Sequence, residues 1–343
     1  MSVIVTGSVA YDYLMSFPGH FGEHILPEQI HQISLSFLVD SMRKQRGGCA
    51  PNIAYTLALL GEHPTIMATV GQDFGEYRAW LEDQGIDTSA IVEVSEDFTS
   101  SFFVNTDLDN NQIATFYIGA MGKADMLSFH NLDKPIELAI ISPNAPAAMS
   151  KYAQECQELE IPYIYDPSQQ IIRLSGEELL EGTQGARMLI VNEYEFGMIK
   201  SKTGLSEQEL LSLPDTTIIT RGDLGSTIYA EDQVHHIPAV VPDQVTEPTG
   251  AGDAYRGAVI KGMLKGYPWE LTGRIAALAA TYVLEQLGTQ NHYYTLSEFA
   301  ERYRLFFGDT PELDLFCRGK QVRPLASNIG IKPNKEQNCD KRL

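Results

Sequence analysis

Residues 246–258 read Thr-Glu-Pro-Thr-Gly-Ala-Gly-Asp-Ala-Tyr-Arg-Gly-Ala, a glycine turn that places one carboxylate at the start of an apolar helix. The glycines let the backbone approach a ligand closely, and the free N–H groups and dipole of the first helical turn favour an anion there. Asp253 could take a proton from an attacking hydroxyl while these N–H groups hold a transferring phosphoryl group. The candidate catalytic residues are therefore Gly250, Ala251, Gly252 and Asp253. Taken alone, the same turn is equally typical of a helix N-cap on a tight loop.

A second glycine element lies far upstream, in residues 47–61, which read Gly-Gly-Cys-Ala-Pro-Asn-Ile-Ala-Tyr-Thr-Leu-Ala-Leu-Leu-Gly. Pro51 suits the first turn of a helix, the apolar residues after it form a core-facing stripe, and the last glycine suits the helix end. Asn52 is therefore expected near the helix start, with its amide directed at a ligand lying over Gly47 and Gly48. A Gly-Gly pair before a helix is common by itself.

With their internal spacings and their separation, the two elements resemble the two signatures of the PfkB family of sugar and nucleoside kinases, whose fold is the ribokinase-like one. The resemblance covers roughly residues 1–310. Within the family, the chain is similar to bacterial adenosine kinases of the actinobacterial type. Four stretches carry this narrower likeness: Thr-Gly-Ser-Val-Ala-Tyr-Asp-Tyr-Leu-Met-Ser-Phe-Pro-Gly at 6–19, Ser-Leu-Ser-Phe-Leu-Val-Asp at 34–40, Phe-Tyr-Ile-Gly-Ala-Met at 116–121 and Asp-Pro-Ser-Gln-Gln at 166–170.

The composition is that of a well-packed protein: 343 residues, 43% hydrophobic and 20% charged, with a net charge of −20. That charge argues against nucleic acid or an anionic membrane as the main partner, so a bound nucleotide must be met by local N–H groups, a few cations and a metal. The four cysteines show neither metal-ligand spacing nor a disulfide framework. The first residues predict a core strand rather than an export signal, and no uncharged apolar run reaches the roughly 18 residues of a membrane span. We therefore expect a cytoplasmic protein.

Short apolar runs alternate with helical patterns along most of the chain. Because this alternation is typical of a mostly parallel sheet with helices on both faces, the sequence predicts an α/β fold. The resemblance implies the ribokinase-like version, a three-layer α/β/α domain with a small β-sheet lid. The expected strands of the central sheet lie at 3–5, 65–70, 138–142, 163–165, 188–191 and 216–220.

Residues 12–45 and 91–119 break the alternation and are richer in alternating polar and apolar residues. The segment Asp107-Leu-Asp-Asn-Asn-Gln112 is typical of a hairpin tip between strands at 101–105 and 113–118. We predict that the two regions form the lid, and that residues 1–11, 46–90 and 120–317 form the large nucleotide-binding and catalytic domain. Past about residue 318 the composition lacks periodicity, which predicts a solvated, flexible tail at 318–343.

A substrate pocket follows from the resemblance. Asp12, shortly after the first strand, would accept hydrogen bonds from two ribose hydroxyls, which suits a carboxylate. Without the resemblance, Asp12 is also typical of a turn or cap residue. The residues implied to hold the ribose are Ser8, Asp12, Gly47, Gly48 and Asn52.

An apolar slot beside the ribose would distinguish a nucleoside from a free sugar. Phe102 and Phe116 stand on the two predicted lid strands, where adenosine kinases of this type carry phenylalanines that sandwich adenine. Aromatic residues on a strand are also common core residues. Free-sugar kinases of the family would more often carry polar lid residues here.

The nucleotide site is implied by two further elements. Asn192-Glu-Tyr-Glu195 matches the family's Asn-x-x-Glu element, in which Glu195 would act on Mg²⁺ through water, although an Asn cap with an acidic first turn has the same pattern. The stretch 220–225 matches the Thr-x-Gly-x-x-Gly turn that runs along the ATP phosphates, or it is a simple turn between strands. Its candidate ATP-binding residues, together with Asn192, are Thr220, Arg221, Gly222 and Gly225.

Glu247 departs from the family, which usually has Asp at a position that helps to hold a monovalent cation. Glutamate keeps the charge but moves it by a methylene, so potassium activation is left open.

The features together predict ATP-dependent phosphorylation of the 5′-hydroxyl of adenosine to AMP, a purine-salvage reaction, by direct in-line transfer with Mg²⁺ and Asp253 as general base. One alternative is a PfkB kinase for another nucleoside or for a free sugar such as ribose or fructose. The other is a non-catalytic ligand-binding member, which has no need of Asp253. The expected partners are adenosine and ATP, and a homodimer formed through the lid, as in some relatives, is left open.

Overall fold

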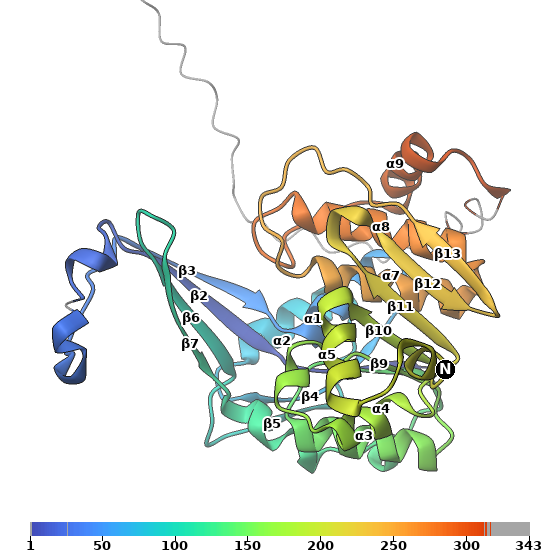
Figure 1. The fold of residues 1–343 in the computed structure, drawn as a ribbon, viewed down its shortest axis with the longest axis horizontal. Helices are drawn as coiled ribbons and strands as arrows, with labels where there is room; N and C mark the ends of the chain where they lie inside the picture. Colours follow the sequence, from blue (N-terminus) through green and yellow to red (C-terminus); the bar gives the residue numbers. More distant parts are fainter. Residues whose placement is uncertain (1, 26, 312, 314–315, 317–343) are drawn as a thin grey trace, which may run out of the picture.

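The computed structural model describes residues 2–25, 27–311, 313 and 316 of the chain, and within them two β-sheets lie apart (Figure 1). The central sheet has nine strands, which in spatial order are Gln233–Ile237 (β13), Ser226–Ala230 (β12), Thr216–Thr220 (β11), Met188–Asn192 (β10), Tyr163–Tyr165 (β9), Ile136–Ile141 (β8), Ser2–Thr6 (β1), Thr65–Gly71 (β4) and Ile91–Val94 (β5). From β11 to β5 every neighbouring pair is parallel, whereas β12 and β13 add an antiparallel edge.

Helices cover both faces of the central sheet. Successive side chains of a strand point to opposite faces, and accordingly Val3 and Val5 of β1 pack into one core while Ile4 packs into the other. The first core includes residues of Cys49–Leu59 (α1), Gly75–Asp83 (α2), Ala251–Lys265 (α7), Trp269–Leu284 (α8) and Leu296–Phe307 (α9). The second core includes residues of Pro146–Glu158 (α3), Gly176–Thr183 (α4), Glu193–Thr203 (α5) and Glu207–Leu211 (α6). The predicted three-layer α/β/α fold with a mostly parallel sheet is confirmed.

The second sheet, called the small sheet below, has the spatial order Ser41–Gly47 (β3), Ala10–Ser16 (β2), Ser100–Thr106 (β6) and Gln112–Tyr117 (β7). It projects from one side of the main body as an arm (Figure 1). The predicted hairpin is present: β6 and β7 are antiparallel, and the Asp107 carboxylate closes the turn by accepting the N–H groups of Asp109 and Asn111. Short 3₁₀ helices occupy Phe21–Glu23, Pro27–Gln32, Gly119–Met126, Phe129–Asn131, Ser168–Ile172 and Gly222–Leu224.

The structure differs from the sequence-based boundaries at three points. β5 pairs with β4 in the central sheet, although residue 91 was expected to begin the second lid segment. Its polar and apolar mixture reflects its place at the sheet edge, where Ile91 and Val94 are buried and the two residues between them are exposed. The small sheet also extends to Ala10 and Gly47, because β2 and β3 pair along their whole length. The antiparallel strands β12 and β13 were not among the expected strands.

The predicted tail at 318–343 lies outside the described residues. In the part of the chain that the structure describes, no helix has the length and apolar character needed to cross a membrane.

Candidate active site

A cleft of about 780 Å³ opens at the carboxyl edge of the central sheet, where ligands bind in open α/β folds. Its walls come from the small sheet, from the loops after β1, β8 and β9, and from the first turns of α1 and α7. Nine residues predicted from the sequence line it: Ser8, Asp12, Gly48, Asn52, Phe102, Phe116, Gly250, Gly252 and Asp253. Gly47 and Ala251 are chain neighbours of these lining residues. Segments far apart in the sequence therefore meet in one cavity.

Asp253 lies in the first turn of α7, and a hydrogen bond from α1 holds it. The helix begins after Gly250, whose φ of +84° is left-handed and whose added Cβ would lie 2.8 Å from the Thr289 side chain. Asn52 Nδ2 donates to Asp253 Oδ2 at 2.8 Å. Burial raises the pKa of the Asp253 carboxyl, while the Arg256 guanidinium and the Asn52 amide oppose the shift. A buried carboxylate with a raised pKa is a stronger base than an exposed one.

Arg256, one turn further along α7, forms a buried ion pair that the sequence reasoning missed. Its Nη2 donates to Asp166 Oδ1 at 2.6 Å, and its Nε lies 2.5 Å from Asp166 Oδ2. Burial raises the pKa of Asp166 to about 7, with the guanidinium opposing the shift. A Cβ at Gly252 would lie 2.6 Å from Arg256 Nη1, so this glycine leaves room for the guanidinium as well as for a ligand.

The signals for this pair were present in the sequence. Asp166 directly follows a predicted strand, and Arg256 lies three residues after Asp253 on one helix. Their separation of 90 residues left nothing in the pattern to join them.

Asp12 stands on β2, opposite Phe102 of β6, and lines the cleft. Burial raises its pKa to about 6, and the Glu247 carboxylate adds to the shift. A Cβ at Gly47 would lie 2.6 Å from Asp12 Oδ2, which explains the need for glycine there. Gly48 has a φ of +99°, and its Cβ would lie 2.5 Å from the Ser8 carbonyl oxygen. The two glycines thus allow α1 to begin directly against Asp12 and Ser8.

Phe102 and Phe116 are directly opposite each other on β6 and β7. Cross-strand partners project from the same face of a sheet, so these two rings form a single apolar wall of the cleft rather than the two sides of a sandwich. Phe116 is 46% exposed, which leaves its ring available for contact.

Asn192 and Glu195 lie where β10 leads into α5, and they cap the helix. Asn192 Oδ1 accepts the Glu195 N–H at 2.8 Å, and Glu195 Oε2 accepts the Asn192 N–H at 2.8 Å. The element therefore forms the helix cap that was the alternative interpretation of its sequence. The other oxygen of the carboxylate, Glu195 Oε1, accepts from Ser168 Oγ at 3.2 Å, and Ser168 lines the cleft. The element is thus directly beside the cleft although it is not part of its lining.

The turn at residues 221–225 joins β11 to β12. Thr220 is in register with Asn192, so the two predicted nucleotide elements lie side by side at the sheet edge. Gly225 is required by packing, since its Cβ would lie 2.0 Å from the Ile237 carbonyl oxygen, whereas Gly222 has no atom within 4 Å of its Cβ position. Arg221 Nε lies 3.4 Å from Glu193 Oε1, so its charge is partly neutralised.

Glu247 is engaged within the protein: its Oε2 accepts the Gly288 N–H at 2.8 Å. This bond favours a structural role for the carboxylate over the holding of a monovalent cation.

Several cleft residues were not predicted from the sequence. Gln170 is 8% exposed, and among the described residues its Oε1 has no hydrogen-bond partner. A buried acceptor of this kind is a candidate contact for a ligand N–H group. The other unpredicted lining residues are Ala10, Cys49, Ile118, Met121, Pro143, Ser168, Gln169, Arg173, Thr249 and Thr289. Most lie in loops or short 3₁₀ helices, whose position depends on strand order, which no local pattern reveals.

Comparisons with known proteins agree with this geometry. Residues 13–295 match the model of the pfkB family carbohydrate kinases. The nucleoside kinase of Burkholderia thailandensis, solved in complex with inosine, superposes with a TM-score of 0.79 at 36% identity, covering 90% of this chain and 98% of that one. The nucleoside kinase of Methanocaldococcus jannaschii is 30% identical over 302 residues, which are 88% of this chain and 96% of the relative.

The ribokinase of Thermotoga maritima, at 20% identity and a TM-score of 0.73, shares the fold and covers 88% of this chain and 99% of that one. A match over most of the chain, with the glycine turn and its carboxylate at the carboxyl edge of a ribokinase-like sheet, identifies an ATP-dependent phosphotransferase that acts on a hydroxyl group. The chain belongs to the pfkB family of carbohydrate kinases.

Proposed function

We propose that the protein transfers the terminal phosphoryl group of ATP to the 5′-hydroxyl of a nucleoside, and that adenosine is this nucleoside. The observation that carries the proposal is that one cleft is lined by a partly buried base, Asp253, by a carboxylate suited to a diol, Asp12, and by the apolar wall of Phe102 and Phe116. A nucleoside has a matching hydroxyl, diol and flat base.

In the proposed reaction, Asp253 accepts the proton of the 5′-hydroxyl while the 5′-oxygen of the nucleoside forms a bond to the γ-phosphorus. The bond from that phosphorus to the β–γ bridging oxygen breaks, and ADP leaves. The N–H groups of Gly250, Ala251, Gly252 and Asp253 hold the transferring phosphoryl oxygens. The Ala251 nitrogen lies 3.4 Å from the Pro248 carbonyl oxygen, a long contact that leaves this N–H available for a better acceptor.

The nucleotide and its Mg²⁺ would lie at the ends of β10 and β11. Glu195 suits Mg²⁺ held through water, since both of its oxygens already accept one hydrogen bond each and Mg²⁺ keeps several waters. The open space over Gly222 fits a phosphate beside the turn, with Asn192, Thr220, Arg221 and Gly225 around it. When bound, Mg²⁺ would neutralise charge on the phosphates.

Three observations support a nucleoside, and adenosine in particular. The relatives from Burkholderia and Methanocaldococcus are named nucleoside kinases. A free sugar has no flat aromatic ring to pack against an apolar wall, whereas a purine has one. Gln170 Oε1 is an acceptor without a partner among the described residues, and adenine offers an amino donor where hypoxanthine carries an oxygen.

A coupled ADP-release assay with adenosine, inosine, guanosine, cytidine, ribose and fructose tests the proposal. We expect the highest kcat/KM with adenosine, and we expect Gln170→Leu to reduce the preference for adenosine over inosine. Preference for inosine in the parent protein would support nucleoside kinase activity but exclude adenosine as the preferred substrate. Preference for ribose or fructose would favour the free-sugar kinase, and no ADP release from any acceptor by the folded protein would favour the non-catalytic alternative.

A further inference from the structure

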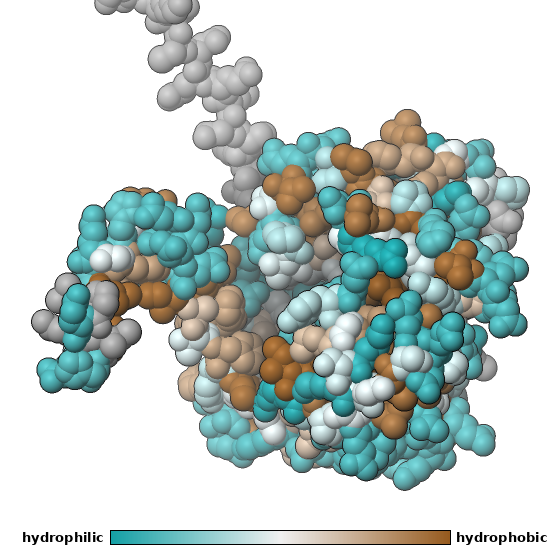
Figure 2. All heavy atoms as spheres, in the orientation of Figure 1, coloured by the Kyte–Doolittle hydropathy of each residue, from teal (hydrophilic) through white to brown (hydrophobic). Residues whose placement is uncertain are grey.

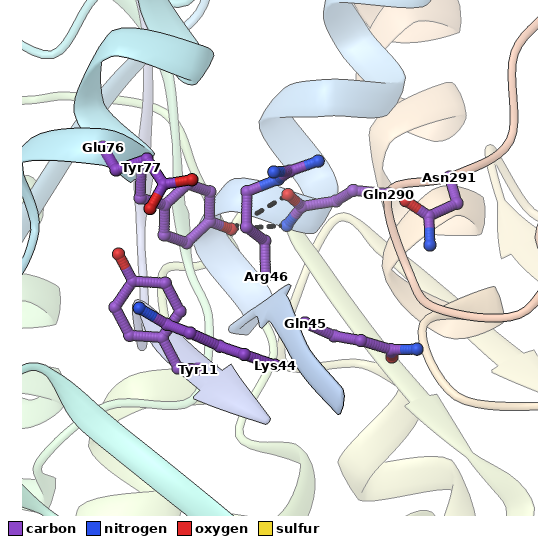
Figure 3. A pocket seen from close by; sticks show the side chains of 8 residues that line it. All are labelled: Tyr11, Lys44, Gln45, Arg46, Glu76, Tyr77, Gln290 and Asn291. Carbon is purple, nitrogen blue, oxygen red and sulfur yellow. Dashed lines mark hydrogen bonds between the residues drawn. The ribbon is translucent and has the colours of Figure 1, made fainter. Parts of the chain in front are cut away.

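A buried chain of hydrogen bonds links the candidate base to the junction of the small sheet. Asn52, which donates to Asp253, accepts at its Oδ1 from Gln290 Nε2 at 2.7 Å. The same Gln290 nitrogen donates to the Tyr77 hydroxyl at 2.6 Å. The single hydrogen of that hydroxyl has two acceptors at 3.0 Å, the Gly47 carbonyl oxygen and Gln290 Oε1, and it goes to Gly47 when the Gln290 nitrogen is the donor to the hydroxyl. Figure 3 shows the Gln290 amide and the Tyr77 hydroxyl in direct hydrogen-bond contact, and both line a small pocket of about 120 Å³.

Because the three side chains are buried, each of their donors must face an acceptor. Asn52, Tyr77 and Gln290 are 5%, 1% and 4% exposed, and a buried polar group without a partner is costly. The Gln290 amide nitrogen carries two N–H donors, and both are used. Asn52 must therefore turn its oxygen towards Gln290 and its nitrogen towards Asp253. The reverse orientation would set the Asn52 oxygen against the carboxylate and its nitrogen against the Gln290 nitrogen.

The loop that carries Gln290 is fixed from both sides. It lies between α8 and α9, and the preceding Thr289 lines the cleft and donates to the Arg46 carbonyl oxygen at 3.3 Å. Gly288 donates its N–H to Glu247. The loop therefore contacts the end of β3 as well as Asn52.

We propose that Gln290 is a positioning residue of the transfer reaction: by fixing the Asn52 amide it holds the Asp253 carboxylate in the orientation that accepts the hydroxyl proton. Tyr77 ties this arrangement to Gly47, where the small sheet joins α1. The inference rests on the proposed role of Asp253 as the base.

The groups that face Asp253 determine what a change at Gln290 should do. Arg256 on the same helix, paired with Asp166 after β9, and the Asn52 amide favour the charged carboxylate, whereas burial favours the neutral form. The Cys49 thiol, whose pKa is raised by burial and by Asp253, stays neutral beside it. Loss of the donated Asn52 hydrogen bond therefore raises the pKa of Asp253, and the acidic limb of the rate profile moves to higher pH.

The test compares Gln290→Met, which keeps the shape but cannot donate, with Tyr77→Phe, which keeps the bond from Gln290 to Asn52. We expect Gln290→Met to lower kcat by ~10–100-fold, with the acidic limb moved to higher pH and the KM for ATP unchanged. Tyr77→Phe should produce a smaller change in the same direction. Asn291→Ala is the matched control, because Asn291 is exposed, donates to the Leu287 carbonyl oxygen and lies in the same loop outside the chain of hydrogen bonds.

A double-mutant cycle separates positioning from general destabilisation. If Gln290 acts through Asn52, Gln290→Met should have little further effect on kcat in an Asn52→Ala background. The inference would be overturned if the losses of kcat in the two single variants multiply in the double variant, or if the acidic limb of the pH–rate profile of Gln290→Met stays where it is in the parent. Gln290→Glu, which faces Asn52 with an acceptor, replaces the methionine variant if the latter fails to fold. If Asp253→Asn retains the parent rate, the proposed function fails; if only the Gln290 variants match the parent, this inference alone fails.

Discussion

At the scale of single residues, the cleft holds acidic groups in positions that favour function over stability. Asp12 is the clearest case, since burial and the Glu247 carboxylate both disfavour its charged form. The charged form is the one that would accept two ribose hydroxyls. Its desolvation is thus a cost to the free protein that a bound diol offsets.

Asp12→Asn is expected to stabilise the protein above pH 6 while weakening nucleoside binding. The folded-state pKa of about 6 is above the ordinary 3.8, so the folded protein binds more protons than the unfolded chain between these values, and stability falls as pH rises through that window. Asparagine has no such penalty. We expect a higher Tm than the parent at pH 8, a smaller difference at pH 4, and a KM for adenosine raised ~10–100-fold through loss of charged hydrogen bonds. Equal adenosine affinity, or a lower Tm at pH 8, would count against this assignment.

At the scale of elements, the contact between α1 and α7 sets the distance from Asn52 to Asp253. Gly257 allows this contact, because a Cβ there would lie 2.9 Å from both the Ile53 carbonyl oxygen and Thr56 Cβ. The two helices therefore approach closely just beyond the two site residues.

Gly257→Ala should separate the helices and lower both stability and rate. Overpacking of this kind costs roughly 1–3 kcal/mol, and the displaced Asn52 should reduce kcat more than it changes the KM for ATP. Gly197→Ala is the control, because Gly197 lies within α5 with no atom within 4 Å of its Cβ position, and the change should be neutral or stabilising by up to ~1 kcal/mol. Urea unfolding and steady-state rates give both quantities. Parent-like stability in Gly257→Ala would contradict the packing account.

The elements were predictable to different degrees for physical reasons. The apolar runs that form β1, β4, β8 and β11 are buried on both faces of the sheet, so their apolar sequence pattern is easily identified. β5 carries a mixed pattern because it is an edge strand, and this made it resemble a lid strand. The turns around Asp12, Asn52 and Asp253 were found because glycine and acidic residues mark them locally. Gln290 could not be found, since its partner Asn52 is 238 residues away and no local pattern marks Gln290.

At the scale of the whole molecule, the small sheet is an arm beside the cleft. Figure 2 shows it set off from the main body, with apolar side chains along its lower edge in that view. Asp12, Phe102 and Phe116 belong to this sheet, whereas Asp253 belongs to the main body. A ligand that touches all of them must join the two parts, and exclusion of water strengthens the polar interactions of transfer.

We therefore expect the small sheet to act as a lid that closes on the nucleoside. Saturating adenosine should slow hydrogen exchange in residues 12–45 and 100–117, because contacts to both parts restrict the arm. The strands β9 and β10, deep in the main body, serve as the internal control and should show no such change. Exchange in the small sheet that is the same with and without adenosine would contradict closure.

The most direct measurement of the central claim is the rate of adenosine phosphorylation by Asp253→Asn, with Asp133→Asn, an exposed carboxylate in the loop before β8, as the control. The amide cannot accept the proton, and a positioned general base contributes ~10²–10⁴-fold, so the turnover number should fall by that factor while adenosine binding is nearly unchanged. The Asp133 variant should match the parent. If Asp253→Asn keeps more than about a tenth of the parent rate, the base lies elsewhere and the assignment of this site is wrong.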